Sequence, residues 1–459
     1  MKRYYIILLL CFVYKISFSQ IDGQLDSAFG NLGVCMSEFL NGASEFSSMC
    51  LDSHQNIFAS SFNSIVKFNE SGEKDSTFAF HGVLNFDVGL SYSYCVSSKA
   101  QSDDKIILGG YSYNTTGVSD SAQVSIIRIS NNGSIDTSFG ENGLFKLNRS
   151  PELFGAMCVA LQSDGKIIAA GKYSNNSPTR LFATRITNEG KLDSTFANNG
   201  VFINPFSELN SSDVVTSCVI QDDQKILIGF NTTQTSSNNF VFGLLRLNPN
   251  GFLDNGFGVD GIVKTDVPIY NYEYSTSVKV QNDGKILQAG STRNAKIMVI
   301  CRYNTDGSLD TLFGNTGIDT LNISTGQDVI NDMVLLEDGK IFLVGRSGSN
   351  ACIIRLHSNG QIDSTFNHDG ILNFGNSNGN IFTRAELLSP TKLLAGGILK
   401  DSNNLPQLGV AAYDFNLFSG IEDAGGMQEA ASIYPNPSRN SIQFKQAPVS
   451  FNMSVCDLT

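Results

Sequence analysis

One motif recurs seven times along this chain, and this repetition constrains the fold more than any other feature. Each copy has an Asp, a Phe three residues later, a Gly four residues after the Phe, and then an aliphatic residue. The copies begin at Asp26, Asp75, Asp136, Asp193, Asp254, Asp310 and Asp363, and successive copies start 49 to 61 residues apart. Such a period is typical of repeat architectures, in which each unit packs against its neighbours.

The central copies of this motif supply the residues that we expect to shape the turns. These structural repeat residues are Asp136, Phe139 and Gly143; Asp193, Phe196 and Gly200; Asp254, Phe257 and Gly261; and Asp310, Phe313 and Gly317. We expect the Phe side chains to be core anchors between units, because large aromatic side chains dominate the packing of cores. None of these residues is therefore assigned to a ligand.

A second motif lies between successive copies of the first. It reads Gln-x-Asp-Gly-Lys-Ile at residues 162–167 and 281–286, and five variants complete a set of seven. Asp-Gly favours positive φ, which suits a tight hairpin between two strands. We expect the strand after each Gly-aliphatic pair to open a four-stranded unit. The Asp-Gly-Lys turn would then join the second strand to the third and the Asp motif would join one unit to the next, which puts both turns on one face.

Four short antiparallel strands in a unit of this size are typical of a propeller blade. We therefore predict an all-β fold, a seven-bladed β-propeller of four-stranded antiparallel blades over residues 20–418. The last expected strand, residues 410–414, lacks the turn that follows its counterparts, and residues 22–29 contain that missing piece. We expect this N-terminal segment to dock beside the last blade and close the ring, giving a monomer with no open terminal blade. An open β-solenoid is the alternative architecture.

The two repeated motifs also carry a family resemblance. The Asp-x-x-Phe-Gly and Gln-x-Asp-Gly-Lys-Ile units resemble those of the delta-60 repeat family over roughly residues 22–418. The resemblance implies a propeller-like architecture. Because the family is largely uncharacterised, it implies no activity.

The N-terminus has the features of an export signal. Met1, Lys2 and Arg3 precede a short apolar run over residues 4–14, and the small residues Ser17 and Ser19 follow it. This order of charged, apolar and small residues predicts a signal peptide over residues 1–19. Near the other end, residues 419–430 are rich in Gly, Ala and acidic residues, and we expect them to form a linker.

The last segment, residues 431–459, begins with a second recognisable pattern. It contains Tyr434, Pro435, Asn436 and Pro437, followed by alternating polar and apolar residues over 441–445. The two prolines favour an extended start to a β module. The segment resembles the start of the type A C-terminal sorting domain of type IX secretion substrates. The resemblance implies a truncated start of a small C-terminal β-sandwich, contact with the outer-membrane secretion machinery, and a secreted or outer cell-surface location.

Charge and cysteine usage exclude several ligand classes. The formal net charge is -12, and no basic cluster occurs beyond the first three residues, so we expect no nucleic-acid partner. None of the nine cysteines has Cys-x-x-Cys spacing. Because Cys50, Cys158 and Cys218 fall at nearly the same place in their repeats, we expect buried small hydrophobic residues rather than bonded partners.

A metal site is considered at residues 304–310, where oxygen-bearing side chains have a spacing similar to that of calcium loops. The first ligand position, however, holds Arg302. Equivalent positions in other repeats hold Arg128, Arg185, Arg246 and Arg355, and one holds Lys67. Because each lies eight residues before a repeat Asp, we predict Arg–Asp pairs across the turns, no metal and no other cofactor.

Catalytic motifs are missing from the sequence. His54, His81, His357 and His368 lie in no metal-binding motif, and no Gly-x-Ser-x-Gly occurs, so no catalytic residue is assigned. Loops rich in Asn, Ser, Thr and Tyr are expected on the face opposite the repeated turns, over residues 111–123, 173–180, 204–213, 231–239, 268–274 and 399–407. Such loops suit adaptable polar contacts.

The sequence thus favours a secreted or cell-surface, non-catalytic binding or adhesion protein for an extracellular glycan or protein. The alternative is a secreted polysaccharide lyase or glycosidase with a site at the propeller axis. A pair of acids, or a His with a Tyr, at a channel mouth would favour the enzyme. The chain has no Trp, the usual platform for sugar stacking, although Tyr could serve.

Overall fold

The computed structural model describes residues 22–38, 45–86, 92–114, 121–147, 153–174, 179–205, 213–233, 240–267, 273–292, 296–374, 379–415, 433–435 and 442–444. They fall in two compact units, Met1–Leu417 and Phe418–Thr459, and each unit is described by itself. The expected signal peptide (1–19) and linker (419–430) lie outside the described residues.

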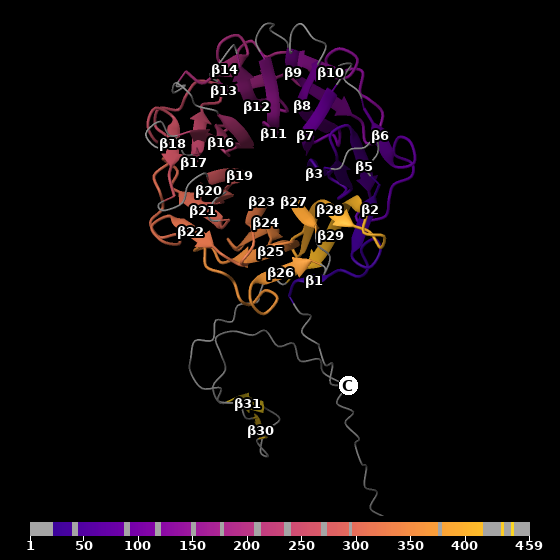
Figure 1. Cartoon of the computed structure of the whole chain (residues 1–459), viewed down its shortest axis with the longest axis vertical. Helices are drawn as coiled ribbons and strands as arrows, with labels where there is room; N and C mark the ends of the chain where they lie inside the picture. The colour runs from indigo at the N-terminus through magenta and orange to yellow at the C-terminus, as the bar shows by residue number, and fades with distance from the viewer. Residues whose placement is uncertain are drawn as a thin grey trace, which may run out of the picture. The chain divides into compact units, whose positions relative to one another are not determined.

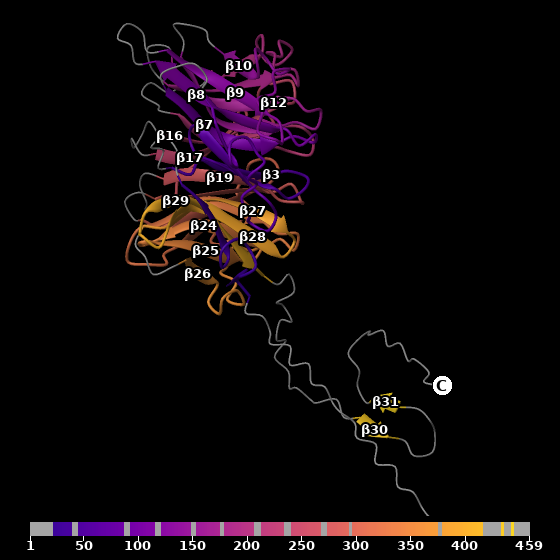
Figure 2. The same cartoon turned by 90° about the vertical axis from the view of Figure 1, so that its right-hand side faces the viewer.

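The first unit consists of seven antiparallel sheets arranged in a ring, with the first strand of each sheet nearest the axis (Figure 1). Figure 2 shows the same ring from its edge. Each sheet is built from four strands in chain order, except that the seventh takes its outer strand from the N-terminal segment. The predicted seven-bladed β-propeller is confirmed.

The strands of the seven blades have the following bounds. Blade 1 contains β3 (Ser48–Leu51), β4 (Ile57–Ser60), β5 (Ser64–Phe68) and β6 (Val83–Asn85); blade 2 contains β7 (Tyr92–Ala100), β8 (Ile106–Asn114), β9 (Ser121–Ile129) and β10 (Leu144–Leu147). Blade 3 contains β11 (Leu153–Leu161), β12 (Ile167–Ser174), β13 (Arg180–Ile186) and β14 (Val201–Ile203); blade 4 contains β15 (Val214–Ile220), β16 (Ile226–Thr233), β17 (Phe240–Leu247) and β18 (Ile262–Thr265). Blade 5 contains β19 (Glu273–Val280), β20 (Ile286–Thr292), β21 (Met298–Tyr303) and β22 (Ile318–Leu321); blade 6 contains β23 (Asp328–Leu335), β24 (Ile341–Ser347), β25 (Asn350–Leu356) and β26 (Ile371–Phe374). Blade 7 contains β27 (Ile381–Ser389), β28 (Lys392–Lys400), β29 (Pro406–Asp414) and β2 (Val34–Ser37), with the short β1 (Gln24–Leu25) also paired to β29.

The two motifs form the turns at one end of each blade, but the expected starting point of the blade was wrong. In blade 3 the Asp-Gly-Lys turn joins the first strand to the second, and Gly165 has φ 83°, as a tight hairpin requires. The Asp motif joins the third strand to the fourth, because its turn folds Val201 back against Thr184. The Gly-aliphatic strand therefore ends a blade instead of opening one. Both kinds of turn still lie on one face. Gln101, in the hairpin turn of blade 2, donates to Asn188, in the Asp-motif turn of blade 3, at 3.2 Å.

The N-terminal segment closes the ring, as the sequence predicts. Strand β2 pairs with β29 from Val34 opposite Ala411 to Ser37 opposite Leu408. The N–H of Gly23 donates to the carbonyl oxygen of Asp414 at 3.0 Å. The first and last parts of the unit thus share one sheet, which leaves no unpaired outer edge on β29.

Neighbouring blades are joined by one backbone hydrogen bond between their Asp-motif turns, and this bond recurs at all seven seams. It runs from Gly30 to Ser71, Ala79 to Asn132, Gly140 to Glu189, Ala197 to Asn250, Gly258 to Asp306, Gly314 to Asn359 and Asn367 to Asp22. The close approach requires a glycine in the receiving turn. At Gly190, for example, φ is 76° and an added Cβ would lie 2.3 Å from the Gly140 nitrogen.

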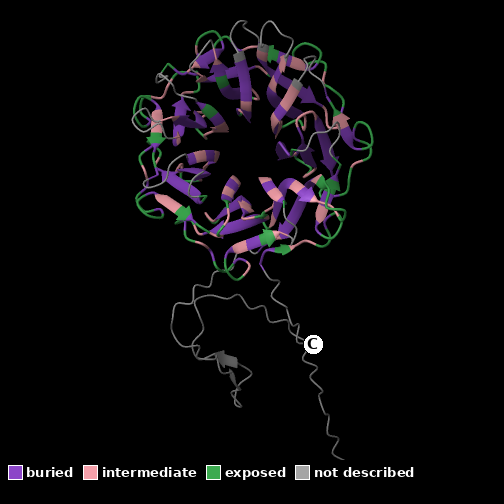
Figure 3. Ribbon diagram, in the orientation of Figure 1, coloured by how far each residue is buried: buried purple, intermediate pink, exposed green. Residues whose placement is uncertain are grey.

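Much of each blade is buried (Figure 3), and the apolar core lies between the blades, where residues of adjacent sheets form common clusters. One cluster, for instance, combines Ile107 and Val124 of blade 2 with Phe154 and Ala169 of blade 3. Phe139 of the Asp motif belongs to the same cluster and is fully buried. The repeat Phe residues are thus anchors between blades, as expected, and they hold the turns against the next blade.

The second unit is described only at two short strands. β30 (Ile433–Pro435) pairs with β31 (Ile442–Phe444) in an antiparallel hairpin. Tyr434 and Pro435 lie in β30, whereas Asn436 and Pro437 lie outside the described residues. Across the described part of the whole chain, no helix has the length and apolar character needed to span a membrane.

Candidate functional site

The face formed by the repeated turns is held together by its own charges. In blade 3, the Nε–H of Arg185 donates to Oδ2 of Asp193 at 2.8 Å, and Nζ of Lys166 lies 3.5 Å from the same oxygen. The other carboxylate oxygen accepts bonds from the N–H and hydroxyl of Thr195. Burial raises the pKa of Asp193, but the Thr195 hydrogen bonds and the Arg185 charge outweigh it and lower the pKa to about 2.

The same pairing is repeated around the ring. The predicted Arg–Asp pairs are present in the structure as Arg128–Asp136, Arg246–Asp254, Arg302–Asp310 and Arg355–Asp363, and Lys67 pairs with Asp75 in blade 1. Each Arg also covers the Phe of its own motif, as Arg246 does Phe257 at 4.3 Å. The Lys of the Asp-Gly-Lys turn is a third member of this charged group, because it lies near the repeat Asp of its own blade. This role was not predicted from the sequence, although the Lys recurs with the same period as the Asp. We assign this face to structure rather than to a ligand.

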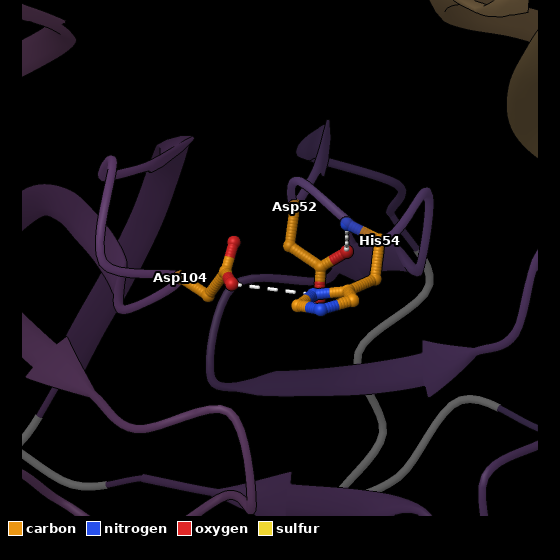
Figure 4. Close-up of side chains that lie close together, drawn as sticks. All are labelled: Asp52, His54 and Asp104. Carbon is orange, nitrogen blue, oxygen red and sulfur yellow. Dashed lines mark hydrogen bonds and ion pairs between the residues drawn. The ribbon is translucent and has the colours of Figure 1, made fainter.

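One group of potential metal ligands occurs among the described residues, where the turns of blades 1 and 2 meet (Figure 4). His54 Nδ1 lies 3.2 Å from Oδ2 of Asp104, and Asp104 also accepts hydrogen bonds from Ser53. Asp52 already accepts four N–H donors, from the backbones of His54 and Asn56 and the side chains of Asn56 and Asn131. Four donors occupy the lone pairs of a carboxylate, so Asp52 has none to offer an ion. We interpret the group as a hydrogen-bonded clamp between two turns.

The central channel is lined by the first strand of every blade. It encloses a volume of about 440 Å³. Blades 1 to 4 contribute mainly small side chains such as Ser97, Ala160, Thr216 and Ser217, with Lys99 as their charged residue in the lining. Blades 5 to 7 contribute Lys279, Asp332, Arg384 and Glu386. The channel is therefore polar, and its ionisable groups are concentrated on one side.

The charged side of the channel is partly neutralised internally. Asp332 accepts hydrogen bonds from the Ser277 hydroxyl at 2.8 Å and from the N–H of Ala385 at 3.2 Å, and Nζ of Lys279 lies 4.0 Å from it. Burial disfavours the charged form of Lys279, but the carboxylates of Asp332 and Glu386 outweigh it and raise the Lys279 pKa. This group could not be recognised from the sequence, because its residues occupy repeat positions that are uncharged in most blades.

The described cysteines are buried, as expected, and have free thiols. Cys158 and Cys218 lie in one apolar cluster between blades 3 and 4, at the border of the channel. Burial, followed by the neighbouring Cys218 thiol, raises the pKa of Cys158 well above its usual value. The Cys158 thiol is thus held in its protonated, weakly nucleophilic form.

The face opposite the repeated turns carries aromatic side chains at blades 1 and 2. Tyr94 lies in the first strand of blade 2, Tyr111 and Tyr113 lie in the second strand, and Phe62 lies in a turn of blade 1. The three tyrosine rings are nearly parallel, at interplanar angles of 3° to 16°, and the Phe62 ring meets Tyr94 edge-on at 4.7 Å. We call these four residues the aromatic platform. All four side chains are partly exposed.

Buried acids lie near the same end of neighbouring blades. Glu273 and Asp328 begin the first strands of blades 5 and 6 and pair in register with Thr292 and Ser347. Asp328 accepts hydrogen bonds from Ile323, Ser324 and Ser347. Glu273 is fully buried, and neither of its carboxylate oxygens has a hydrogen-bond partner among the residues that the structure describes. Burial raises the pKa of Glu273 to about 7.

We expect the buried Glu273 to make the protein less stable as the pH rises. Its pKa in the folded chain lies above its unfolded value, so its contribution is fully present below about pH 4 and is lost as the pH rises through about 7. Between pH 5 and pH 8, wild type should lose up to about 3 kcal/mol of unfolding free energy relative to Glu273→Gln. Urea denaturation of both proteins at the two pH values measures this difference. Glu141→Gln, at an exposed turn residue, is the control; an equal gap between wild type and Glu273→Gln at both pH values would contradict the prediction.

The ring of four-stranded blades and its recurring turns define the class of the chain, a seven-bladed β-propeller. Five stretches, residues 101–139, 162–196, 221–257, 281–313 and 336–366, match the family model described as "Domain of unknown function (DUF5122) beta-propeller". The stretches that begin at 101 and 162 run from the turn after the first strand to the Phe of the Asp motif. Among curated proteins, no significant match to the chain is found.

Several solved structures are similar to this chain. The polysaccharide lyase Uly1 has 11% sequence identity and a TM-score of 0.50, with 86% of this chain and 97% of that one covered. A protein of unknown function from Dyadobacter fermentans has 10% identity and a TM-score of 0.46, with coverages of 84% and 100%. PorZ, a surface component of the type-IX secretion system of Porphyromonas gingivalis, has 11% identity and a TM-score of 0.41, with coverages of 86% and 49%. At such identities the likeness concerns the fold alone.

Proposed function

We propose that this protein is a secreted or cell-surface, non-catalytic binding or adhesion propeller that contacts an extracellular glycan or protein through the face opposite its repeated turns. One observation carries the proposal: the two faces of the ring are built differently. The repeated turns pair their Arg, Lys and Asp side chains with one another, as at Asp193. The opposite face presents partly exposed tyrosines, which combine apolar area with a polar hydroxyl and suit recognition surfaces.

The proposal predicts that binding depends on the loops between second and third strands. In one variant, residues 115–120, 175–178 and 234–239 would each be replaced by an Asn-Gly turn, which suits a two-residue hairpin. We expect this variant to lose binding to glycan and extracellular-protein arrays, because the replaced segments belong to the proposed contact face. A control variant, Lys166→Ala with Lys225→Ala on the repeated turns, should retain it. Binding that survives the loop replacement and fails in the control would reverse the assignment of the faces.

We also propose that the chain is exported, with its C-terminal segment addressing the outer-membrane secretion machinery. The support is the N-terminal pattern of residues 1–19 and the resemblance at Tyr434, Pro435, Asn436 and Pro437. N-terminal sequencing of the secreted chain should begin near Gln20. Retention of the full-length chain inside the cell would count against export.

A second function is favoured by the charged side of the channel. Asp332 and Glu386 lie in the channel lining with Lys279 and Arg384, and acids beside cations are the groups used in polysaccharide cleavage by lyases or glycosidases. If the protein is such an enzyme, Asp332→Asn and Glu386→Gln should each abolish cleavage while the loop-replacement variant keeps its basal activity. Screening polysaccharides for released reducing ends or unsaturated products separates this function from binding alone.

A further inference from the structure

The geometry of the aromatic platform distinguishes it from ordinary core packing. The three tyrosine ring centroids are 5.1, 5.9 and 6.4 Å apart, so they form a nearly equilateral triangle. In a simple column of three rings, the outer two would be separated by the sum of the inner spacings. The rings of Tyr94, Tyr111 and Tyr113 therefore lie as an offset slab, each touching the other two, with Phe62 closing one edge.

The fold itself does not require aromatic residues at these positions. Tyr94 is opposite Tyr111 in blade 2, and the corresponding pairs are Gly155 with Lys172 in blade 3, Val214 with Asn231 in blade 4, Tyr274 with Ser291 in blade 5, and Val329 with Arg346 in blade 6. Blades 3, 4 and 6 have the same strands and the same bulge with small, aliphatic or polar residues there, and blade 5 has a single tyrosine, Tyr274. Because the repeat builds a blade without the tyrosines, the slab is a local addition at partly exposed positions.

The charge around the slab narrows the ligand class. Glu45 is exposed and close enough to Tyr111 to contribute to its raised pKa, after burial and Tyr113. The whole chain has a formal net charge of -12. Nucleic-acid bases also stack on aromatic rings, but their binding needs a cationic groove. The negative net charge of the chain likewise disfavours a polyanionic glycan.

We propose that the aromatic platform is a subsite for an uncharged polysaccharide, an inference that rests on the proposed binding function. The C–H face of a pyranose ring stacks on the slab of Tyr94, Tyr111 and Tyr113. A tyrosine hydroxyl can both donate a hydrogen bond to a sugar hydroxyl and accept one from it. The exposed Glu45 carboxylate can act as an additional acceptor.

Affinity electrophoresis of the full chain in gels containing neutral polysaccharides tests this proposal. The probes are mixed-linkage β-glucan, galactomannan and amylopectin, with polygalacturonate as the charged comparison. We expect retardation by at least one neutral polymer and an affinity at least about tenfold lower in Tyr111→Ala/Tyr113→Ala, as expected when a stacking partner is removed. Tyr113→Phe should keep most of the affinity. Because the chain has no Trp, its tyrosine fluorescence should also change when the polymer binds.

Tyr274→Ala is the matched control, because Tyr274 occupies the position of Tyr94 in blade 5 and stacks on Phe240 at 5.4 Å. It should bind like wild type, and thermal unfolding of all variants checks that the fold is intact. Equal retardation of wild type and the double variant would overturn the platform and leave the loop-face function standing. The same holds if no neutral polymer retards the protein while a charged glycan or a protein on the arrays binds it. If nothing binds the loop face at all, both proposals fail.

Discussion

Removing residues 22–37 should abolish the cooperative unfolding transition of the propeller. The deletion takes away β1 and β2, and it exposes the unpaired edge of β29. It also removes Phe29, which is buried between blades 7 and 1, and Asp26, which pairs with Lys392. Each buried apolar side chain contributes roughly 1.5–3 kcal/mol. The combined loss is comparable with the total stability of a typical domain, about 5–15 kcal/mol.

A circular permutant supplies the control for this deletion. Because the Gly23 N–H already bonds to the carbonyl of Asp414, residues 22–37 can follow residue 415 through a short Gly-Ser connection, with the chain restarting at residue 39. We expect the permutant to regain a single cooperative transition by circular dichroism and calorimetry, whereas the deletion gives a broad transition or aggregates. A deletion variant that melts like wild type would show that the N-terminal segment does not close the ring.

The features that the sequence predicted correctly are those that recur in every repeat. Seven Asp motifs and seven hairpin motifs specify seven blades, and a fixed eight-residue spacing brings Arg185 to Asp193. The starting point of the blade could not be obtained in this way, because a periodic pattern is unchanged when its origin is shifted by one strand. Only the pairing of Val201 with Thr184 shows that the Gly-aliphatic strand ends its blade.

The propeller axis and the range 111–123 were named from the sequence as places for a site, but the residues of the candidate sites were not singled out, since these residues break the repeat. Lys279, Asp332 and Glu386 come from three blades, and their proximity depends on the ring being closed. The tyrosines could have been noticed by aligning the copies on the Ile after each hairpin turn, where Tyr111 stands against Lys172 and Asn231. In a propeller of this kind, positions at which one copy departs from the repeat indicate a candidate site, whereas positions common to all copies indicate the fold.

Replacing Arg355 by Met should lower the unfolding free energy by about 3–5 kcal/mol, the usual cost of removing one partner of a buried ion pair. Arg355 and Asp363 are fully buried, and Nε of Arg355 donates to Asp363 at 2.8 Å. The NH2 group of Arg355 lies 2.7 Å from Asp22, so the same guanidinium joins blade 6 to the segment that closes the ring. Without it, two carboxylates lose a shared cation at the closing seam. The midpoint of urea denaturation at pH 7 measures the effect.

The pH dependence of this loss distinguishes an electrostatic role for Arg355 from packing alone. Burial raises the pKa of Asp363, but the Thr365 hydrogen bond and the charges of Arg355 and Lys340 outweigh it and lower the pKa. That stabilising contribution is present above the unfolded pKa near 4 and is lost as the pH falls through the folded value. The gap between wild type and Arg355→Met should therefore narrow between pH 7 and pH 3. Arg128→Met, at a pair that is more exposed and does not contact the closing segment, should cost less at pH 7. A gap that is the same at both pH values would mean that Arg355 acts mainly by covering Phe366, which it contacts at 5.0 Å.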